Sequence, residues 1–206
     1  MVTLTGYDRV SNLSGVYQGF PFQQKAYTLR NRISYTRFFD QLSHSYTVQN
    51  GDTLDTPNTV ALTSGIEYSY DIHGNVDSLL NIYGIGSPMV AHGYNRFKVI
   101  AYHYDLISGK VNEVHYQPGF ADEWYHRYEY DADNRLTDVY STDTKATLGQ
   151  SGLEEHEAHY EYYKHGPLAR AVLGHQQVQG VDYAYTLQGW LKGVNSTSLN
   201  PAVDLG

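Results

Sequence analysis

His156 and His159 are the two residues whose type and spacing come nearest to a chemical motif. A helical zinc site needs two histidines four residues apart with a glutamate between them, so that both rings leave the helix on one face. Here the spacing is three, and Gly149 and Gly152 disfavour a long helix. We therefore interpret residues 148–158 as part of a polar insertion loop and assign no metal site.

The other chemical patterns in the sequence are also incomplete. No Gly-x-Ser-x-Gly sequence is present, and Gly84-Ile85-Gly86-Ser87-Pro88 lacks the third glycine of a dinucleotide-binding loop. Zero cysteines exclude thiolate ligands, a cysteine nucleophile and disulfides. His103, His115 and His126 fall in or beside expected strands, where we interpret them as outward-facing cross-strand neighbours. We expect no catalytic residue, no cofactor and no enzymatic activity.

Composition narrows the class of protein further. The 206 residues carry 14 Lys and Arg against 22 Asp and Glu, a net charge of −8. This acidic balance argues against a nucleic-acid surface and against a polybasic membrane anchor. No apolar stretch approaches the roughly 18 residues of a membrane span, and the first residues do not resemble a signal peptide. The 21 tyrosines and 19 glycines favour β structure with many tight turns.

One short pattern recurs along the chain: two tyrosines two residues apart, an aspartate, a turn and an apolar exit residue. The clearest copies are Tyr68–Val76 and Tyr128–Leu136, and Tyr102–Val111 is one residue longer. Degenerate copies begin at Tyr160 and Tyr183, and an upstream copy begins at Tyr27. The residue after the second tyrosine is called the anchor below; the anchors are Thr28, Asp71, Asp105, Asp131, Tyr163 and Thr186. Six copies predict a repeat architecture.

Each copy is typical of a β-hairpin closed by a turn of about four residues. Tyrosines two residues apart point to the same face of a strand. Asp131 can bond the backbone two residues ahead and open the turn, while Gly74 and Asn134 supply a positive φ. The exit residues Leu136 and Val139 are three apart, which breaks strict alternation. A β-bulge or a strand buried on both faces would explain that spacing.

We therefore predict an all-β fold, a single antiparallel array of hairpins over residues 1–206 with a curved sheet. Asp71, Asp105 and Asp131 are assigned to turns and need no catalytic role. The repeat copies are placed near residues 27–33, 68–79, 102–114, 128–139, 160–172 and 183–194. Insertion loops are expected near residues 49–58, 83–92 and 143–158.

The recurring pattern resembles the YD repeat, also called the RHS repeat, of bacterial RHS proteins. The resemblance rests on Tyr128–Leu136, Lys164–Arg170 and Gln179–Trp190, and extends from about Tyr27 to Asn195. It implies a β-sheet that forms part of a larger spiral shell around a C-terminal effector, often a toxin. It also implies a secreted or cell-surface protein, whose partners are the neighbouring repeats and the effector, and possible contacts with surface glycans or proteins.

Part of the family pattern has no counterpart in this sequence. Toxin-bearing members carry, after the repeats, a segment rich in Asp-Pro that hosts self-cleavage, whereas here Asn200-Pro201 stands alone near the end. The expectation is therefore a fragment of the repeat array. Its function would be structural, encapsulating or presenting an effector that is absent from this sequence.

The tyrosine pairs allow a structural and a binding interpretation. In the first, the rings stack along the sheet and keep each hydroxyl near water or a partner. In the second, exposed aromatic faces form a carbohydrate-binding or adhesive surface. We favour the structural interpretation, because the tyrosine positions coincide with the repeat. Arg32, Lys110 and Arg135 follow the turns and could lie over tyrosine rings, contributing about 0.5–1 kcal/mol each.

Overall fold

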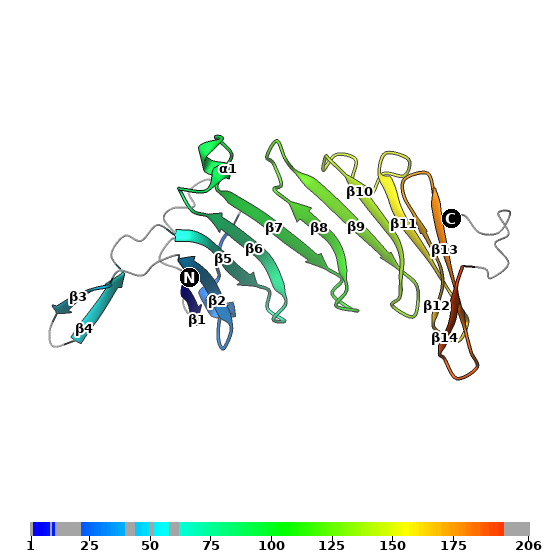
Figure 1. The fold of residues 1–206 in the computed structure, drawn as a ribbon, viewed down its shortest axis with the longest axis horizontal. Coiled ribbons are helices and arrows are strands. Elements are labelled where there is room, and N and C mark those ends of the chain that lie inside the picture. Colours follow the sequence, from blue (N-terminus) through cyan, green and yellow to red (C-terminus); the bar gives the residue numbers. More distant parts are fainter. Residues whose placement is uncertain are drawn as a thin grey trace. The chain divides into compact units, whose positions relative to one another are not determined.

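The computed structural model describes residues 2–8, 10, 22–39, 44–49, 52–57 and 62–195, which form an all-β structure (Figure 1). Two short helical turns, η1 (Ala26–Thr28) and α1 (Pro88–Ala91), interrupt the strands. No helix among the described residues is long and apolar enough to cross a membrane. The strands are β1 (Val2–Tyr7), β2 (Ile33–Phe39), β3 (His44–Gln49), β4 (Asp52–Pro57), β5 (Leu62–Tyr70), β6 (Val76–Tyr83), β7 (Phe97–Tyr104), β8 (Val111–Tyr116), β9 (Trp124–Tyr130), β10 (Leu136–Thr142), β11 (Glu155–Tyr162), β12 (Leu168–Leu173), β13 (Gln179–Tyr185) and β14 (Leu191–Val194).

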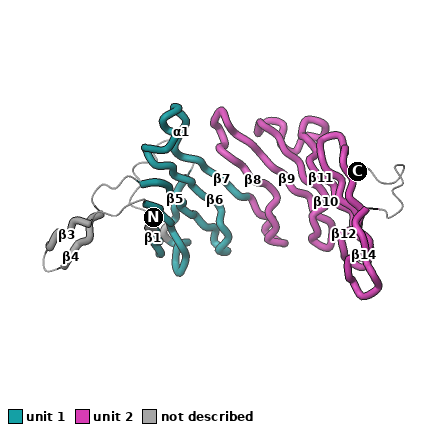
Figure 2. The backbone as a smooth tube through the Cα atoms, in the orientation of Figure 1, with its two compact units in different colours: residues 1–102 teal, residues 103–206 magenta. Residues whose placement is uncertain are grey.

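The chain divides into two compact units, residues 1–102 and residues 103–206 (Figure 2). In the first unit the strand order is β1-β2-β5-β6-β7, and β3 pairs with β4 as a separate hairpin. In the second unit β8 to β14 lie in sequence order, each strand paired antiparallel with the next. Antiparallel neighbours need only hairpin connections, as the repeat predicts. The prediction of an antiparallel all-β fold is confirmed.

The first unit has an apolar core built across the β6–β7 ladder. Leu80 pairs with Val99 and Ile82 with Phe97, and all four side chains are buried. Phe22 joins this cluster from outside the strands, and Leu62 packs against it. Alternate residues of a strand share one face, so the spacing of two in β6 and in β7 brings the four side chains together.

A β-bulge follows the exit residue in five of the repeat copies. In the β9–β10 ladder Leu136 pairs with Tyr130 and Asp138 with Glu129, so one residue is left over. The bulge explains the spacing of Leu136 and Val139, and no strand buried on both faces is needed. The extra residues of the five ladders, each six positions after its anchor, are Ser34, Asp77, Thr137, Ala169 and Lys192.

Two of the expected insertion loops are wrong in part. Residues 49–58 lie largely in strands, because β3 ends at Gln49 and β4 begins at Asp52. The dipeptide between these strands is Asn-Gly, the strongest short hairpin signal. The loop predicted at 143–158 ends at Glu154, since pairing of β11 with β10 and β12 extends the strand over the last four residues.

The third expected loop, residues 83–92, connects β6 to β7 and contains α1. The hydroxyl of Ser87 accepts a hydrogen bond from the N–H of Val90 and caps this single turn. A Cβ atom on Gly84 would lie 1.9 Å from the carbonyl oxygen of Leu62, so only glycine fits there. The glycine that resembled a dinucleotide-binding loop is therefore explained by close packing of the backbone.

Candidate functional site

All six repeat turns place a residue with positive φ three positions after the anchor, or four in the longer copy. Glycine adopts this conformation freely, and asparagine is the usual exception. The register deduced from the sequence is therefore the register of the structure. In the upstream copy η1 stands where a first strand was expected, so only its turn and the exit strand β2 follow the repeat. The six residues are Asn31 (58°), Gly74 (101°), Gly109 (71°), Asn134 (61°), Gly166 (116°) and Gly189 (84°).

Asp131 organises its turn with both its backbone and its carboxylate. Its N–H donates to the carbonyl of Arg135 at 2.9 Å, and the N–H of Asn134 donates to its carbonyl at 3.0 Å. Its Oδ1 accepts the N–H groups of Asp133 and Arg135, both at 2.9 Å, and its Oδ2 accepts Nε of Arg135 at 2.7 Å. The backbone and side-chain hydrogen bonds from Arg135 lower the pKa of the Asp131 carboxyl.

Asp71 closes its turn in the same way. The degenerate copies keep the backbone bonds, and at Thr186 the hydroxyl also accepts the N–H of Trp190 at 3.1 Å. Oδ1 of Asp71 accepts the N–H groups of the residues two, three and four positions ahead, at 2.7 to 2.9 Å. Burial alone would raise the pKa of Asp71, but these hydrogen bonds and one from the Asn75 side chain lower it. At Tyr163 and Thr186 the anchor N–H still donates to the carbonyl four residues ahead, at 2.9 and 2.8 Å. Turn formation therefore explains why Asp71, Tyr163 and Thr186 stand at the anchor position of their copies.

The second tyrosine of three copies bonds to the hairpin before it. The hydroxyl of Tyr130 donates to the carbonyl of Val111 at 2.8 Å, and that of Tyr162 donates to the carbonyl of Leu136 at 2.7 Å. Tyr70 bonds in the same way to Ile33 at 2.8 Å. The acceptor is always the exit residue of the preceding copy, and we call this contact the inter-hairpin tyrosine bond.

The acceptor carbonyl lies where two neighbouring hairpins separate. The β10–β11 ladder ends with Asp138 opposite His159, and Leu136 lies two residues beyond that pair. A backbone carbonyl that has left its ladder needs another partner if it is partly buried, and the tyrosine hydroxyl supplies one. Val111, the acceptor for Tyr130, is placed in the same way: it lies two residues beyond Glu113, the last residue of β8 that pairs with β9 at that end.

A basic residue next to the exit residue covers the same tyrosine ring. The guanidinium carbon of Arg135 lies 4.7 Å from the ring centre of Tyr162, and that of Arg32 lies 5.3 Å from that of Tyr70. These distances are those of cation–π contacts, so the prediction is confirmed for Arg32 and Arg135. For Lys110 it stays a prediction.

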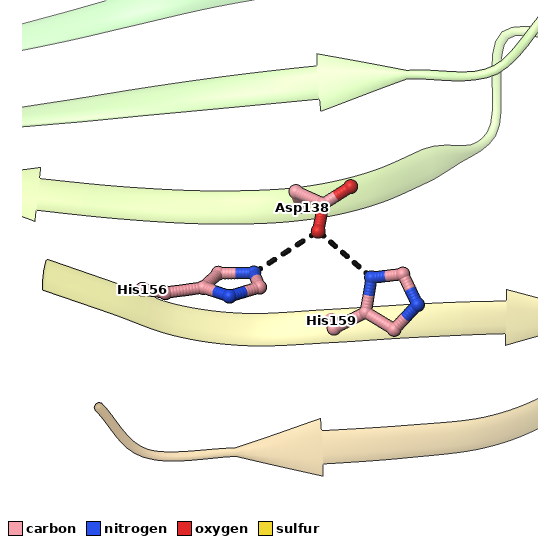
Figure 3. A group of neighbouring side chains, drawn as sticks. All are labelled: Asp138, His156 and His159. Carbon is pink, nitrogen blue, oxygen red and sulfur yellow. Dashed lines mark hydrogen bonds and ion pairs between the residues drawn. The ribbon is translucent and has the colours of Figure 1, made fainter. Parts of the chain in front are cut away.

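Asp138, His156 and His159 form the one group of side chains, among the described residues, that could hold a metal ion (Figure 3). Oδ1 of Asp138 lies 3.0 Å from Nε2 of His156 and 2.7 Å from Nδ1 of His159. The two histidines lie in β11, so the assignment of His156 to the insertion loop is wrong. Their spacing of three would place them on opposite faces of a regular strand, but a bulge at Glu157 returns both to one face.

Neighbouring groups fix the two histidine rings. The ring of His156 stacks on Tyr140, with centroids 4.7 Å apart and an angle of 17° between the planes. Nε2 of His159 lies 3.8 Å from the carboxylate of Glu161. Burial alone would raise the pKa of Asp138, but the hydrogen bonds from His159, Thr137 and His156 and the electrostatic interaction with His159 lower it below its ordinary value. The carboxylate is therefore ionised and faces two imidazole nitrogens.

The histidines expected to face outward divide between buried and exposed positions. His115 is buried, which corrects the prediction, because its ring packs against those of His103 and Tyr125 at 4.3 and 4.8 Å. Burial lowers its pKa, against the opposing effect of its 2.8 Å contact with Glu113. His103 is exposed, as expected, and the half-buried His126 also has a pKa lowered by burial.

An aromatic cavity of about 700 Å³ lies at the turns of the last two hairpins. Its lining includes Tyr163, His165 and Tyr185. The rings of Tyr163 and His165 stack with centroids 5.4 Å apart, and Tyr185 meets Tyr163 edge-on at 6.2 Å. Aromatic faces gather at this cavity, as the binding interpretation of the tyrosines requires.

Comparisons with known proteins give distant similarities. No protein-family model and no curated protein matches the chain. Among solved structures it is similar to TcdB2-TccC3, with a TM-score of 0.47 and 14% identity over 81% of this chain. It is also similar to TcdB2-TccC3-Cdc42, with a TM-score of 0.45 and 15% identity over 79%. The chain spans 10% of the length of each matched chain. The likeness assigns no family.

Asp138 is the site residue that sequence reasoning missed. It was one of many acidic residues, and nothing in its immediate sequence separates it from the others. The available signal was the irregular spacing of Leu136 and Val139, which indicated a bulge beside it. The bulge in β11 was not predicted. A spacing of three between His156 and His159 fits neither the helical zinc motif nor one face of a regular strand, and so it did not indicate that the two side chains lie together.

Proposed function

We propose that this chain is a structural segment of a longer array of hairpins of the RHS/YD-repeat type. The observation that carries the proposal is the inter-hairpin tyrosine bond, which joins successive copies at Tyr70, Tyr130 and Tyr162. Each of these hairpins supplies the hydrogen bond that the previous hairpin lacks at its exit carbonyl. Such a unit is suited to stacking in series, where each repeat contacts its neighbours.

The outer strand β14 supports a continuation of the array. Leu191 is the exit residue of the last copy and is 56% exposed, and Val194 on the same strand is 49% exposed. By contrast, the exit residue Leu136, which a following hairpin covers, is half-buried. Apolar side chains along a strand edge favour pairing with a further strand. We propose that β14 pairs with the next repeat.

We further propose that the array forms the wall of a shell that encapsulates or presents an effector domain. The support is the resemblance of the YD pattern, and a secreted or cell-surface location is proposed on the same ground. We also propose that the chain has no catalytic activity. The repeat turns and the inter-hairpin contacts use its two most frequent residue types, glycine and tyrosine, in structural positions.

The test is sedimentation velocity over a range of protein concentrations. We expect the wild-type chain to self-associate through its open edges, and the variant Leu191→Lys/Val194→Lys to associate less, because charge on an edge strand opposes pairing. Ile107→Lys is the control: it replaces an apolar side chain that is 97% exposed in a turn instead of on an edge strand. A wild-type monomer at every concentration, with a sharp and reversible melt, would contradict the proposal.

A second candidate function is carbohydrate binding at the aromatic cavity of Tyr163, His165 and Tyr185. Stacked rings beside open space are the usual platform for a sugar face. A glycan-array screen of the wild type and of Tyr185→Ala tests this function. Carbohydrate binding is favoured if the wild type binds a glycan and Tyr185→Ala, still folded, does not. If the wild type binds no glycan on the array, this second function is excluded and the structural function remains.

A further inference from the structure

We propose that Asp138, His156 and His159 bind a divalent transition-metal cation, of which Zn²⁺ is the probe used below. One potential ligand atom from each side chain lies within 4.8 Å of the others. Two imidazoles and one carboxylate suit Zn²⁺ and other first-row divalent ions, whereas Ca²⁺ and Mg²⁺ prefer oxygen ligands. The proposal goes beyond the structural function, because the repeat itself requires no metal.

An ordinary ion pair at this position would not need the second histidine. In the β12–β13 interface the equivalent pair is Arg170 opposite Asp182, joined at 3.1 Å in a ladder that shows no register shift. Here the pair is Asp138 opposite His159, and the bulge in β11 adds His156 at the same carboxylate oxygen. Bulges commonly re-aim a side chain toward a site. The added histidine completes a set of three ligands.

The cluster is held in place and remains open to solvent. Tyr140 orients the ring of His156 by stacking. The Glu161 carboxylate lies 3.8 Å from Nε2 of His159, the nitrogen that does not face Asp138. Metal-bound histidines commonly direct their second nitrogen to a carboxylate in this way. The side chains of Asp138, His156 and His159 are 16%, 26% and 35% exposed, so an ion can enter without unfolding.

Binding of the ion would replace the hydrogen bonds to Asp138 by coordination. Each facing nitrogen must present a lone pair, so its proton moves to the other ring nitrogen or is released. Three protein ligands leave the fourth tetrahedral position for water. The ion would join β10 to β11, and thus two successive hairpins, and would stabilise the folded chain by mass action.

The test is a Zn²⁺ titration of the full chain in a non-chelating buffer, followed by calorimetry and by thermal unfolding. We expect one Zn²⁺ per chain, a rise in the melting temperature, and no such rise with Mg²⁺. His156→Gln, His159→Gln and Asp138→Asn should each weaken binding at least about tenfold, the lower range for loss of a supporting group. The control His175→Gln removes an exposed histidine outside the cluster and should leave binding unchanged.

Two results would overturn the proposal: no Zn²⁺ binding by the wild type, or binding that His175→Gln weakens as much as His159→Gln. Circular dichroism shows whether each variant folds. The wild type also gives a readout that needs no variant, because Zn²⁺ should shift the imidazole nitrogen NMR signals of His156 and His159. Shifts confined to other histidines are a third result that would overturn the proposal, beside the two binding results.

Discussion

The hydroxyl of Tyr162 donates a hydrogen bond to the main-chain carbonyl of Leu136 at 2.7 Å, across the point where two hairpins separate. Arg135, the neighbour of Leu136, covers the same tyrosine ring and bonds to the anchor of its own turn, Asp131. Tyr162 therefore contacts both the exit residue of the preceding hairpin, Leu136, and an arginine that is bonded to the turn of that hairpin. Tyr70, Tyr130 and Tyr162 each connect successive repeats through such a hydrogen bond.

The turn glycines should be replaceable according to their surroundings. Gly109 has a φ of +71° and open space where a Cβ would lie. We expect Gly109→Asn to change the free energy of unfolding by no more than about 0.5 kcal/mol, because asparagine tolerates this conformation. Gly109→Val should cost about 1–3 kcal/mol through backbone strain. Urea unfolding measures both, and equal effects would show that the repeat register is wrong.

Gly74 should be less tolerant of the same change. Its φ is +101°, and a Cβ there would lie 2.3 Å from a guanidinium nitrogen of Arg32. That guanidinium bonds to the carbonyl of Thr28 at 2.6 Å and lies over Tyr70. Gly74→Asn should therefore destabilise the chain more than Gly109→Asn does in the same urea experiment. A smaller effect at Gly74 would mean that Arg32 moves aside freely.

The carboxylate of Asp131 should make folding sensitive to acid. Its folded-state pKa is lowered by the hydrogen bonds from Arg135, whereas an unfolded aspartate titrates at about 3.9. Its contribution to stability is therefore complete above about pH 4 and is lost as the pH falls through the lower folded pKa. Urea unfolding of the wild type and of Asp131→Asn at pH 7 and pH 3 should show a smaller difference at pH 3. A difference that stays constant would exclude the linkage.

The ion pair between Glu154 and Arg127 should fasten the 143–154 loop to the sheet. Glu154 is buried, lies 2.6 Å from the Arg127 guanidinium, and accepts the N–H of Gly149 at 2.8 Å. Burial alone would raise the pKa of Glu154, but the hydrogen bonds from Arg127 and Gly149 lower it. Glu154→Gln should cost about 3 kcal/mol, because it leaves a partly buried charge with a weakened partner. Chemical denaturation gives the value.

The control for that change is the neighbouring exposed residue, Glu155. Glu155→Gln should stay within about 0.5 kcal/mol of the wild type. If Glu154→Gln were as mild as Glu155→Gln, the pair with Arg127 would be a surface contact of little energetic consequence.

The turns were predictable because their chemistry is local. An anchor that bonds forward and a residue that tolerates positive φ lie within four positions, so Asp131 and Asn134 could be assigned from the sequence alone. The bulge after the exit residue was half predictable. The spacing of Leu136 and Val139 showed an irregularity, but its nature depended on the register with Tyr130 in the other strand.

The contacts between hairpins could not be predicted in this way. The partner of Tyr162 is a backbone carbonyl 26 residues away, which leaves no side-chain signature. The cluster at Asp138 depends on a bulge in β11. The strand β11 itself forms because it pairs with β10 and β12, although Gly149 and Gly152 before it favour a loop. Tertiary pairing decided those elements, and local sequence decided the turns.

The most direct test of the connecting role of the tyrosines is a comparison of hydroxyl deletions within one strand. Tyr162→Phe removes the inter-hairpin tyrosine bond and keeps the ring under Arg135. Tyr160→Phe makes the same change at the first tyrosine of the pair, which does not form this bond. The pair Tyr70→Phe and Tyr68→Phe repeats the comparison in the other unit.

We measure the free energy of unfolding of these four variants in urea. The second-tyrosine variants, Tyr162→Phe and Tyr70→Phe, should lose about 0.5–1.5 kcal/mol each, the usual net value of one hydrogen bond. The first-tyrosine variants should stay within about 0.5 kcal/mol of the wild type. Equal losses in the two sets, or no loss in either, would contradict the conclusion that the second tyrosine joins each hairpin to the one before it.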